Sequence, residues 1–158
     1  GYMELRNVPA EVVAQVTKLQ SVALCANLTR QVATYCMVHP PRSGDESYPL
    51  YASERDRIIG ELRRRSALLA EGLNRIPGIR CNQIAGAMYA FPSITLPPGR
   101  TDEEYCLALL EETGVCVVPG SGFGQVPGTA HLRTTILPPT GKIEAVVERL
   151  ARFHASYR

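Results

Sequence analysis

Apolar residues recur at helical spacing in the first third of the chain. Pro9 stands in the first turn of the first such stretch, where a helix tolerates proline, and apolar residues follow on one face at positions 12, 13, 16 and 19. A second helix is predicted over residues 27–38, because the run His39-Pro40-Pro41 excludes helical backbone just before it. A short strand is predicted ahead of both helices, at Tyr2–Leu5.

The longest helical pattern begins after a stretch of helix breakers. Residues 40–50 (PPRSGDESYPL) are polar and rich in proline and glycine, which predicts a connection. The helix that follows is predicted to begin at Ser53 and end at Ile76. Ser53 and Asp56 form a capping-box signature at its start, and Pro77-Gly78 ends it.

Short strands alternate with helices from residue 79 onward. Thr101 and Glu104 form a second capping box, so a helix is predicted there, and Gly114 ends it. A last helix is predicted to begin near Thr140, with apolar residues along one stripe as far as Tyr157. Four strands are predicted between these helices, over residues 79–84, 87–91, 115–118 and 131–137.

This order of elements predicts an α/β protein. A chain of 158 residues corresponds to one domain, or to one domain and a fragment. The breaker-rich connection beside the long helix predicts a division into residues 1–50 and residues 51–158. The chain opens with GYMELRNV and has no initiator methionine, so we expect a piece of a longer protein.

Charge and cysteine content exclude several classes of function. A net charge of +2 gives no electrostatic footprint for nucleic acid or for an acidic membrane. The basic triplet Arg63–Arg65 is interpreted as a solvated helix face, because acidic residues flank it and consecutive residues spread around a helical turn. The 5 cysteines include no Cys-x-x-Cys pair, so we expect neither a disulfide framework nor a zinc site, and a reducing compartment is favoured. No apolar run approaches the roughly 20 residues that span a bilayer.

A glycine-rich loop lies between two apolar runs in the stretch VVPGSGFGQVPGTAHLRTTIL, residues 117–137. A phosphate-binding P-loop needs Lys and then Ser or Thr after its glycines, and it leads into a helix. Here no lysine follows Gly124, and the next residues have the pattern of a strand. Residues 120–124 are therefore interpreted as a connection whose glycines permit positive φ, and not as a phosphate or dinucleotide site.

Arg133 lies on the predicted strand that follows this loop. Side chains alternate along a strand, so Arg133 and Leu132 point to opposite faces. The residues alone leave two interpretations open. Arg133 is either an arginine on the solvated face of a sheet or an anion clamp, whose planar fork of donors grips a carboxylate and stays charged at any working pH.

Three runs of sequence resemble a known family: GAMYAFP (86–92), LLEETGVCVVPGSGFGQ (109–125) and HLRTTILPP (131–139). Together with the leading GYMEL they resemble the C-terminal part of the alanine aminotransferases, a family of pyridoxal-phosphate-dependent class I/II aminotransferases of fold type I. The resemblance covers essentially the whole chain. It implies a remnant of the large cofactor-binding domain in residues 1–50. It also implies a small α/β C-terminal domain in residues 51–158, with helices packed on a small mixed or antiparallel sheet.

The resemblance also implies an activity: transfer of an amino group between L-alanine and 2-oxoglutarate, giving pyruvate and L-glutamate, through pyridoxal phosphate. Arg133 matches the residue that holds the substrate carboxylate. Tyr89 matches an aromatic residue that lines the substrate pocket, and a half-buried strand aromatic is the alternative for Tyr89. The family further implies amino-acid and 2-oxo-acid substrates, a homodimer, no metal, and no nucleic-acid or membrane partner. It implies a cytoplasmic location, with the mitochondrion as the alternative.

The Schiff-base lysine of the family precedes its GGYME stretch, and this chain begins inside that stretch. Lys18 and Lys142 lie on predicted helices outside the family's motif. No catalytic residue is therefore expected in this segment, its cofactor-binding residues are left unassigned, and the segment alone is expected to be inactive. Residues 24–31 (LCANLTRQ) depart from the proline and glycine of similar proteins, so no cofactor contact is assigned to them.

Two alternatives remain. One is another class I aminotransferase with a different amino-acid preference. The other is a stand-alone α/β ligand-binding or interaction domain without chemistry. The residues upstream of Gly1 would separate them, because a Ser-x-x-Lys stretch followed by Arg and Gly-Gly-Tyr supports the enzyme and an initiator methionine supports the stand-alone domain.

Overall fold

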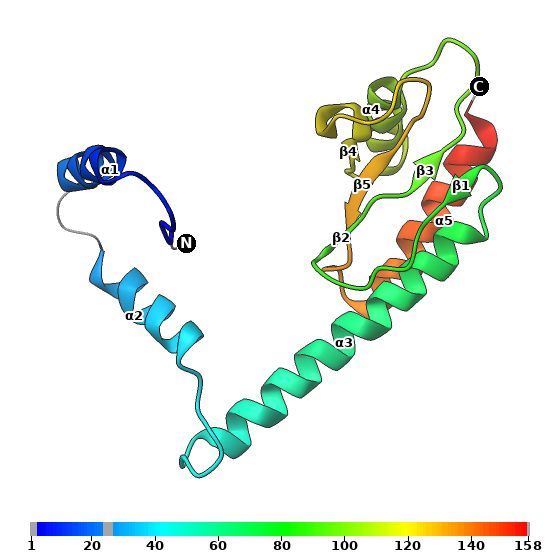
Figure 1. Ribbon diagram of the computed structural model, residues 1–158. Coiled ribbons are helices and arrows are strands. Elements are labelled where there is room, and N and C mark those ends of the chain that lie inside the picture. The colour runs from blue at the N-terminus through cyan, green and yellow to red at the C-terminus, as the bar shows by residue number, and fades with distance from the viewer. Residues whose placement is uncertain (1–2, 24–26, 158) are drawn as a thin grey trace. The chain divides into compact units, whose positions relative to one another are not determined.

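The computed structural model describes residues 3–23 and 27–157. The chain divides into two compact units, residues 1–51 and residues 52–158. Figure 1 shows two helices at the start of the chain, then the long helix α3, and then short strands with two further helices. None of the helices in the described ranges combines the length and apolarity that a membrane-spanning helix requires.

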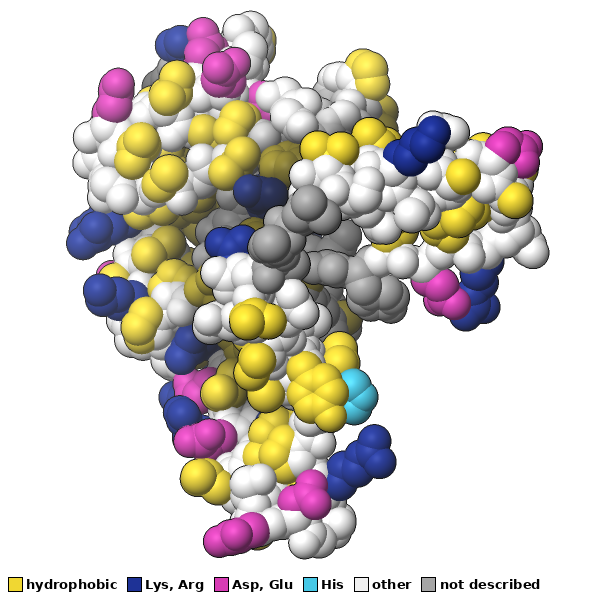
Figure 2. Space-filling model, turned by 90° about the vertical axis from the view of Figure 1, so that its left-hand side faces the viewer, with side chains coloured by type: hydrophobic (Ala, Val, Ile, Leu, Met, Phe, Trp, Pro, Cys, Tyr) yellow, Lys and Arg dark blue, Asp and Glu magenta, His cyan; other side chains and the backbone are white. Residues whose placement is uncertain are grey.

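The first unit contains helix α1 (Ala10–Val22) and helix α2 (Leu28–Val38). The second helix begins at Leu28, one residue after the predicted start, because Asn27 caps it: the side chain of Asn27 accepts a hydrogen bond of 3.1 Å from the backbone N–H of Arg30. Neither helix contains a buried residue. Figure 2 shows many hydrophobic side chains exposed on the face of the molecule that it presents. In this unit the large exposed ones include Leu19, Leu28 and Met37.

The strand predicted at Tyr2–Leu5 is wrong for residues 3–5, which the structure places outside any strand. Tyr2 lies outside the described residues. A strand requires a neighbour for its backbone donors and acceptors, and the sheets of the described chain are built from β1 to β5 alone.

Helix α3 (Tyr48–Asn74) begins five residues before the predicted start at Ser53. Ser53 therefore lies inside the helix, and the capping box predicted for Ser53 and Asp56 is wrong. The helix starts from a turn instead, in which the backbone N–H of Tyr48 donates to the carbonyl of Asp45 at 3.0 Å. Pro49 is compatible with this start, because the N–H groups of the first helical turn have no partner within the helix.

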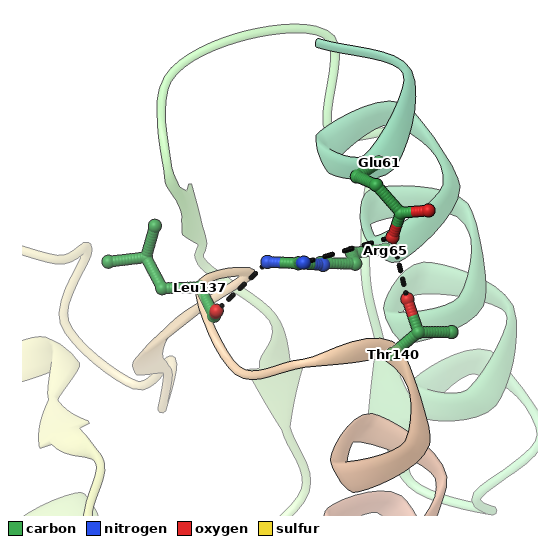
Figure 3. A network of polar contacts seen from close by, with 4 residues as sticks. All are labelled: Glu61, Arg65, Leu137 and Thr140. Atoms are coloured by element: carbon green, nitrogen blue, oxygen red, sulfur yellow. Dashed lines mark hydrogen bonds and ion pairs between the residues drawn. The ribbon is translucent and has the colours of Figure 1, made fainter. Parts of the chain in front are cut away.

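The solvated face predicted for Arg63–Arg65 is correct for the first two arginines and wrong for Arg65. Arg63 and Arg64 are exposed, whereas the side chain of Arg65 is only 22% exposed. Figure 3 shows Arg65 reaching from α3 to the segment after strand β5: its Nη1 donates to the carbonyl of Leu137 at 3.1 Å. Oε2 of Glu61 lies 3.7 Å from Nη2 of Arg65 and accepts a hydrogen bond of 3.2 Å from the hydroxyl of Thr140. Arg65 and Glu61 together therefore connect the long helix to the segment after β5 and to the start of helix α5 (Thr140–Ser156).

The second unit contains five two- to four-residue strands in two small sheets. Strands β1 (Ile79–Arg80) and β3 (Ser93–Ile94) form one sheet. In the other, β5 (Leu132–Thr135) lies between β2 (Tyr89–Ala90) and β4 (Val118–Pro119). Every pairing is antiparallel, and a bridge between Ser93 and His131 joins the two sheets. The predicted α/β class, with helices on a small sheet, is confirmed.

The strands are shorter than the sequence predicted. Residues 81–84 and 87–88 have strand-like patterns but lie outside β1 and β2. Asn74 explains part of this difference, because its side-chain amide pairs with the backbone N–H and carbonyl of Cys81 at 3.0 and 2.8 Å. These are the backbone groups that a continuing strand would need for its neighbour.

The hydrophobic core lies between the helices and the sheets of the second unit. Helix α4 (Asp102–Thr113) contributes Tyr105 and Leu109, both 0% exposed. Strand β5 contributes Leu132, also 0% exposed. Burial of one large apolar side chain stabilises a fold by about 1.5–3 kcal/mol. The remaining members include Leu69 and Leu73 from α3 and Ile143, Leu150 and Phe153 from α5.

Candidate functional site

Strand β5 carries Arg133 through the centre of a three-stranded sheet. Arg133 lies opposite Val118 of β4 in the antiparallel register. On the other side of β5, Thr135 lies opposite Tyr89 of β2. Because neighbouring side chains on a strand alternate between its faces, buried Leu132 anchors β5 to the core while Arg133, partly exposed, points to the other face. The sheet thus places Arg133 and Tyr89 on neighbouring strands.

Two aromatic rings face the guanidinium group of Arg133. Its Cζ lies 4.8 Å from the ring centre of Tyr89 and 4.6 Å from that of Phe123. Such contacts are electrostatic, between a cation and the negative face of a ring, and contribute about 0.5–1 kcal/mol each at exposed sites. A cation–π contact depends on the charge of the guanidinium and does not require its N–H donors as hydrogen-bond partners, so these donors can bind other groups.

The guanidinium group of Arg133 has no ion pair and no hydrogen bond with any residue in 3–23 or 27–157. Its charge is therefore offset by aromatic faces and solvent and not by a carboxylate of the described chain. A planar fork of donors in this state can take a carboxylate in a bidentate pair. Both interpretations that the residues alone left open, the solvated arginine and the anion clamp, are compatible with this geometry.

The glycine-rich loop connects β4 to β5. Its residues Gly120–Phe123 form one turn of 3-10 helix, which Gly124 closes with φ of 72°. The backbone N–H of Gly120 donates to the carbonyl of His131 at 2.8 Å. A Cβ atom on Gly120 would lie 2.6 Å from the Cβ of His131, so the close approach of the two segments requires glycine there. The loop leads into a strand and not into an α-helix, and its position sets Phe123 over Arg133.

The group that anchors this loop, Asp102, was not predicted from the sequence. This residue is 5% exposed and begins α4. Its Oδ2 accepts hydrogen bonds from the backbone N–H of Ser121 at 2.7 Å and from Nε2 of Gln125 at 2.9 Å. In the sequence Asp102 is one of three acidic residues in the first turn of a helix, and only its burial distinguishes it from its neighbours. No local pattern could have linked it to a loop about twenty positions further on.

Phe91, Phe123 and His131 were also missed. The ring of His131 stacks on that of Phe91, with centres 5.0 Å apart and planes 6° apart. Phe91 in turn meets Phe123 edge to face at 5.8 Å. The available signal is the phenylalanine in each of the runs GAMYAFP and GSGFGQ. The contact between these two residues depends on the pairing of β2 with β5.

A second polar group in this unit, His154, lies apart from the arginine. The Tyr105 hydroxyl lies 2.9 Å from Nδ1 of His154. Burial lowers the pKa of His154, while a hydrogen bond to the backbone of Pro77 acts in the opposite direction. Burial also raises the pKa of Tyr105, with smaller contributions from Cys106 and Tyr157. Burial, with neighbouring Asp102 and Cys116, raises the pKa of the Cys106 thiol to about 12. All three shifts favour the neutral form of the group at physiological pH.

The two lysines of the chain are both exposed. Lys18 lies on α1 in the first unit, and Lys142 lies in the first turn of α5 in the second. A lysine that forms a Schiff base is often activated by desolvation, and the exposure of Lys18 and Lys142 does not provide it.

The chain resembles known proteins across its length. A family model described as aminotransferase class I and II matches residues 7–150. A probable mitochondrial alanine aminotransferase of Dictyostelium discoideum is 48% identical, over 99% of the chain and 31% of that protein. Alanine aminotransferase 1 of Bos taurus is 46% identical, over 99% of the chain and 34% of that protein. The chain therefore spans about a third of the length of these relatives.

Solved structures of aminotransferases also match most of the chain. An alanine aminotransferase from Pyrococcus furiosus matches with a TM-score of 0.77 and 32% identity, covering 92% of the chain and 34% of that protein. An aspartate aminotransferase from Rhizobium meliloti matches with a TM-score of 0.70 and 28% identity, covering 93% of the chain and 36% of that protein.

Proposed function

Because the chain belongs to the aminotransferase class I and II family and has part of the type I fold, we propose that it is the C-terminal portion of an alanine aminotransferase. The whole enzyme transfers an amino group between L-alanine and 2-oxoglutarate and gives pyruvate and L-glutamate. Alanine aminotransferases that are 45–48% identical over 99% of the chain support this choice of substrates. The observation that carries the proposal is the guanidinium of Arg133, faced by two aromatic rings and with its donors unpaired in the described chain.

In this proposal Arg133 binds the carboxylate that the amino acid and the oxo acid share. A bidentate pair fixes both oxygens of the carboxylate and so fixes the direction of the bonds at the neighbouring carbon. Holding the substrate in one orientation removes part of the entropic barrier to reaction. An arginine suits this role better than a lysine, because an ammonium is a point charge without the planar fork.

Tyr89 lines the substrate pocket in the same proposal. Its side chain is 45% exposed, so it is not a core residue. Its ring faces Arg133 from the neighbouring strand. The ring thereby limits the directions in which a carboxylate approaches the guanidinium and presents an apolar wall to the rest of the substrate.

The family uses pyridoxal phosphate, which supplies an electron sink for the carbon that loses its proton. The residues described here do not fit a site for this cofactor, since both lysines are exposed and the glycine-rich loop leads into a strand. We therefore place the cofactor-binding residues of the enzyme outside this segment and derive no step through the cofactor. Borohydride reduction of the 158-residue chain with pyridoxal phosphate should give no stoichiometric adduct at Lys18 or Lys142 in a peptide map. A stoichiometric adduct at either lysine, with turnover, would overturn this assignment.

The proposal also covers the organisation of the enzyme. Residues 1–50 are a remnant of the large cofactor-binding domain, and residues 51–158 are the connecting helix and the small domain. The exposed apolar faces of α1 and α2 support the first assignment, because such faces need a hydrophobic partner surface. The enzyme is proposed to be a homodimer in the cytoplasm. A mitochondrial location is the alternative, because some of the relatives are named as mitochondrial.

The amino donor is the direct test of this proposal. The full-length protein that contains these residues is assayed with 2-oxoglutarate and with alanine, aspartate or tyrosine as the donor. We expect kcat/KM to be highest for alanine. A higher kcat/KM for aspartate or tyrosine would assign the protein to another specificity in the same family. No transfer from any donor by a cofactor-loaded protein would support a domain without this chemistry.

A further inference from the structure

A continuous series of contacts runs from buried Asp102 to the guanidinium of Arg133. It begins at the two hydrogen bonds that Asp102 accepts from Ser121 and Gln125. It ends at the ring of Phe123, which lies between Ser121 and Gln125 in the sequence and 4.6 Å from Cζ of Arg133. Asp102 thus holds both sides of the short turn that presents this ring.

The carboxylate of Asp102 is not needed to cap its own helix. Thr101 and Glu104 already form a complete capping box at the start of α4, with hydrogen bonds of 3.2 and 3.0 Å. Asp102 accepts instead from a loop that is distant in sequence. A buried carboxylate is costly unless donors compensate for the lost water, so the loop and Asp102 stabilise one another.

Gln125 extends the anchor to strand β5. A carboxylate only accepts hydrogen bonds, so the amide nitrogen of Gln125 must face Asp102 and its oxygen must face away. That oxygen lies 3.0 Å from Nδ1 of His131. Nδ1 of His131 therefore carries the proton and donates it. This hydrogen bond connects the turn that carries Phe123 to His131, which precedes Arg133 by two residues on the chain.

The aromatic rings complete the connection. The rings of His131 and Phe91 are stacked, and Phe91 meets Phe123 edge to face. Phe123 is 48% exposed and is not held by burial in the core. Its position over Arg133 depends on the turn beneath it and on these ring contacts.

We propose that Asp102 is a positioning residue for the substrate carboxylate, because it anchors the turn that keeps Phe123 against the guanidinium of Arg133. This inference rests on the proposed function of Arg133. Phe123 restricts the plane of the guanidinium, and the plane sets the direction of its donors. Without the anchor the turn moves, the ring no longer faces Arg133, and the donors are no longer aimed before the substrate arrives.

The first test reads the position of Arg133 directly and needs no activity. In the NMR spectrum of the full-length protein with labelled arginine, the aromatic rings should shift the Nε–Hε resonance of Arg133 away from that of a free arginine. We expect Asp102→Ala and Phe123→Ala to move this resonance toward the free position. Glu103→Ala is the matched control, because it removes an exposed carboxylate from the same helical turn, and it should leave the resonance in place. A resonance that responds to Phe123→Ala but not to Asp102→Ala would overturn the inference.

The second test uses the full-length enzyme with its cofactor and measures kcat/KM for alanine and the inhibition constant of propionate, a carboxylate probe without an amino group. Asp102→Ala should lower kcat/KM and raise the inhibition constant by about three- to thirtyfold, the range expected for the loss of one aromatic contact to Arg133. Glu103→Ala should change neither by more than about twofold. In a Phe123→Ala background, Asp102→Ala should have little further effect, because both changes remove the same ring from Arg133.

Two further variants keep the test decisive if Asp102→Ala does not fold. Gln125→Ala breaks the link to His131 while Asp102 keeps the Ser121 N–H, and Asp102→Asn keeps an acceptor without the charge. Each variant should raise the inhibition constant of propionate by a smaller factor than Asp102→Ala does. Wild-type inhibition constants in both variants would refute the positioning role. If Arg133→Ala itself leaves propionate inhibition unchanged, the proposed function of Arg133 fails. If Arg133→Ala abolishes that inhibition while Gln125→Ala and Asp102→Asn do nothing, only the inference about Asp102 fails.

Discussion

Arg133 is held on β5 by aromatic faces and not by a carboxylate partner among the described residues. This difference matters for the proposed role of Arg133 in binding a carboxylate. An internal carboxylate would compete with a bound carboxylate for the same N–H donors, whereas a cation–π contact forms no conventional hydrogen bond with them. The aromatic neighbours therefore fix the side chain and leave its binding capacity intact.

Tyr89 provides a prediction at this scale, measured in the full-length enzyme. Tyr89→Phe keeps the ring face against Arg133, so kcat/KM for alanine should stay within about threefold of wild type. Tyr89→Ala removes the contact, worth about 0.5–2 kcal/mol, and should lower kcat/KM by about two- to thirtyfold. Equal losses in both variants would contradict this account and assign the role to the hydroxyl group.

His154 has no part in the proposed chemistry, but its burial alters its pKa and so makes stability depend on pH. Its lowered pKa means that the folded state binds a proton less readily than the unfolded state does. The free energy of unfolding should therefore be insensitive to this residue above about pH 6.5, the ordinary pKa of histidine, and should fall as the pH decreases below it.

Urea unfolding of the chain at about pH 7.5 and about pH 5.5 measures this effect. His154→Gln should show a smaller loss of stability between the two values than wild type, because it has no imidazole to protonate. His39→Gln is the control, since His39 lies exposed at the end of α2, and it should behave as wild type. The same loss in His154→Gln as in wild type would contradict the assignment.

At the scale of elements, helix α4 has the most completely specified ends. Its first turn combines the capping box of Thr101 and Glu104 with three acidic residues, which favour the positive end of the helix dipole. At its other end Gly114 adopts φ of 71°, a left-handed conformation that glycine tolerates without strain. Because Asp102 and Tyr105 project from this helix, its start also sets the positions of the loop anchor and the core.

Capping gives the prediction at this scale. Thr101→Ala removes the acceptor for the N–H of Glu104 and should lower the free energy of unfolding by about 0.5–2 kcal/mol. Thr101→Ser keeps the hydroxyl and should cost much less. Chemical denaturation of the three chains measures both effects. A loss in Thr101→Ser as large as that in Thr101→Ala would show that packing, and not the cap, is responsible.

The sequence predicted those elements whose ends are determined locally. The box at Thr101 and the glycine at 114 needed only neighbouring residues, and the structure confirms both. Ser53 and Asp56 had the same spacing, yet α3 begins at Tyr48 because a turn closed by Asp45 starts the helix earlier. The anchoring role of Asp102 was unpredictable for a related reason, since its partners Ser121 and Gln125 reach it only through tertiary folding.

At the scale of the whole molecule, the two units differ in how they bury apolar residues. The second unit has a continuous core that includes residues of α3, α4, α5 and the strands, whereas α1 and α2 bury none. The sequence predicted apolar stripes in both parts, because a stripe depends only on spacing. Whether a stripe is covered depends on the partner surface, which the local pattern does not encode. The site at Arg133 lies within the second unit, so its geometry rests on that core.

The central claim is that Arg133 clamps the substrate carboxylate, and the most direct test is kcat/KM for alanine in the full-length enzyme with Arg133, Arg133→Lys and Arg133→Ala. Charge-assisted hydrogen bonds contribute roughly 1.5–3 kcal/mol each, so Arg133→Ala should lower kcat/KM by about two to four orders of magnitude. Lysine keeps the charge without the bidentate fork and should recover only part of the loss. The thermal midpoint and the cofactor spectrum should stay near wild type in all three proteins. Nearly equal kcat/KM values would contradict the claim and make Arg133 a solvated arginine of the sheet, and a loss of bound cofactor would point instead to a phosphate contact.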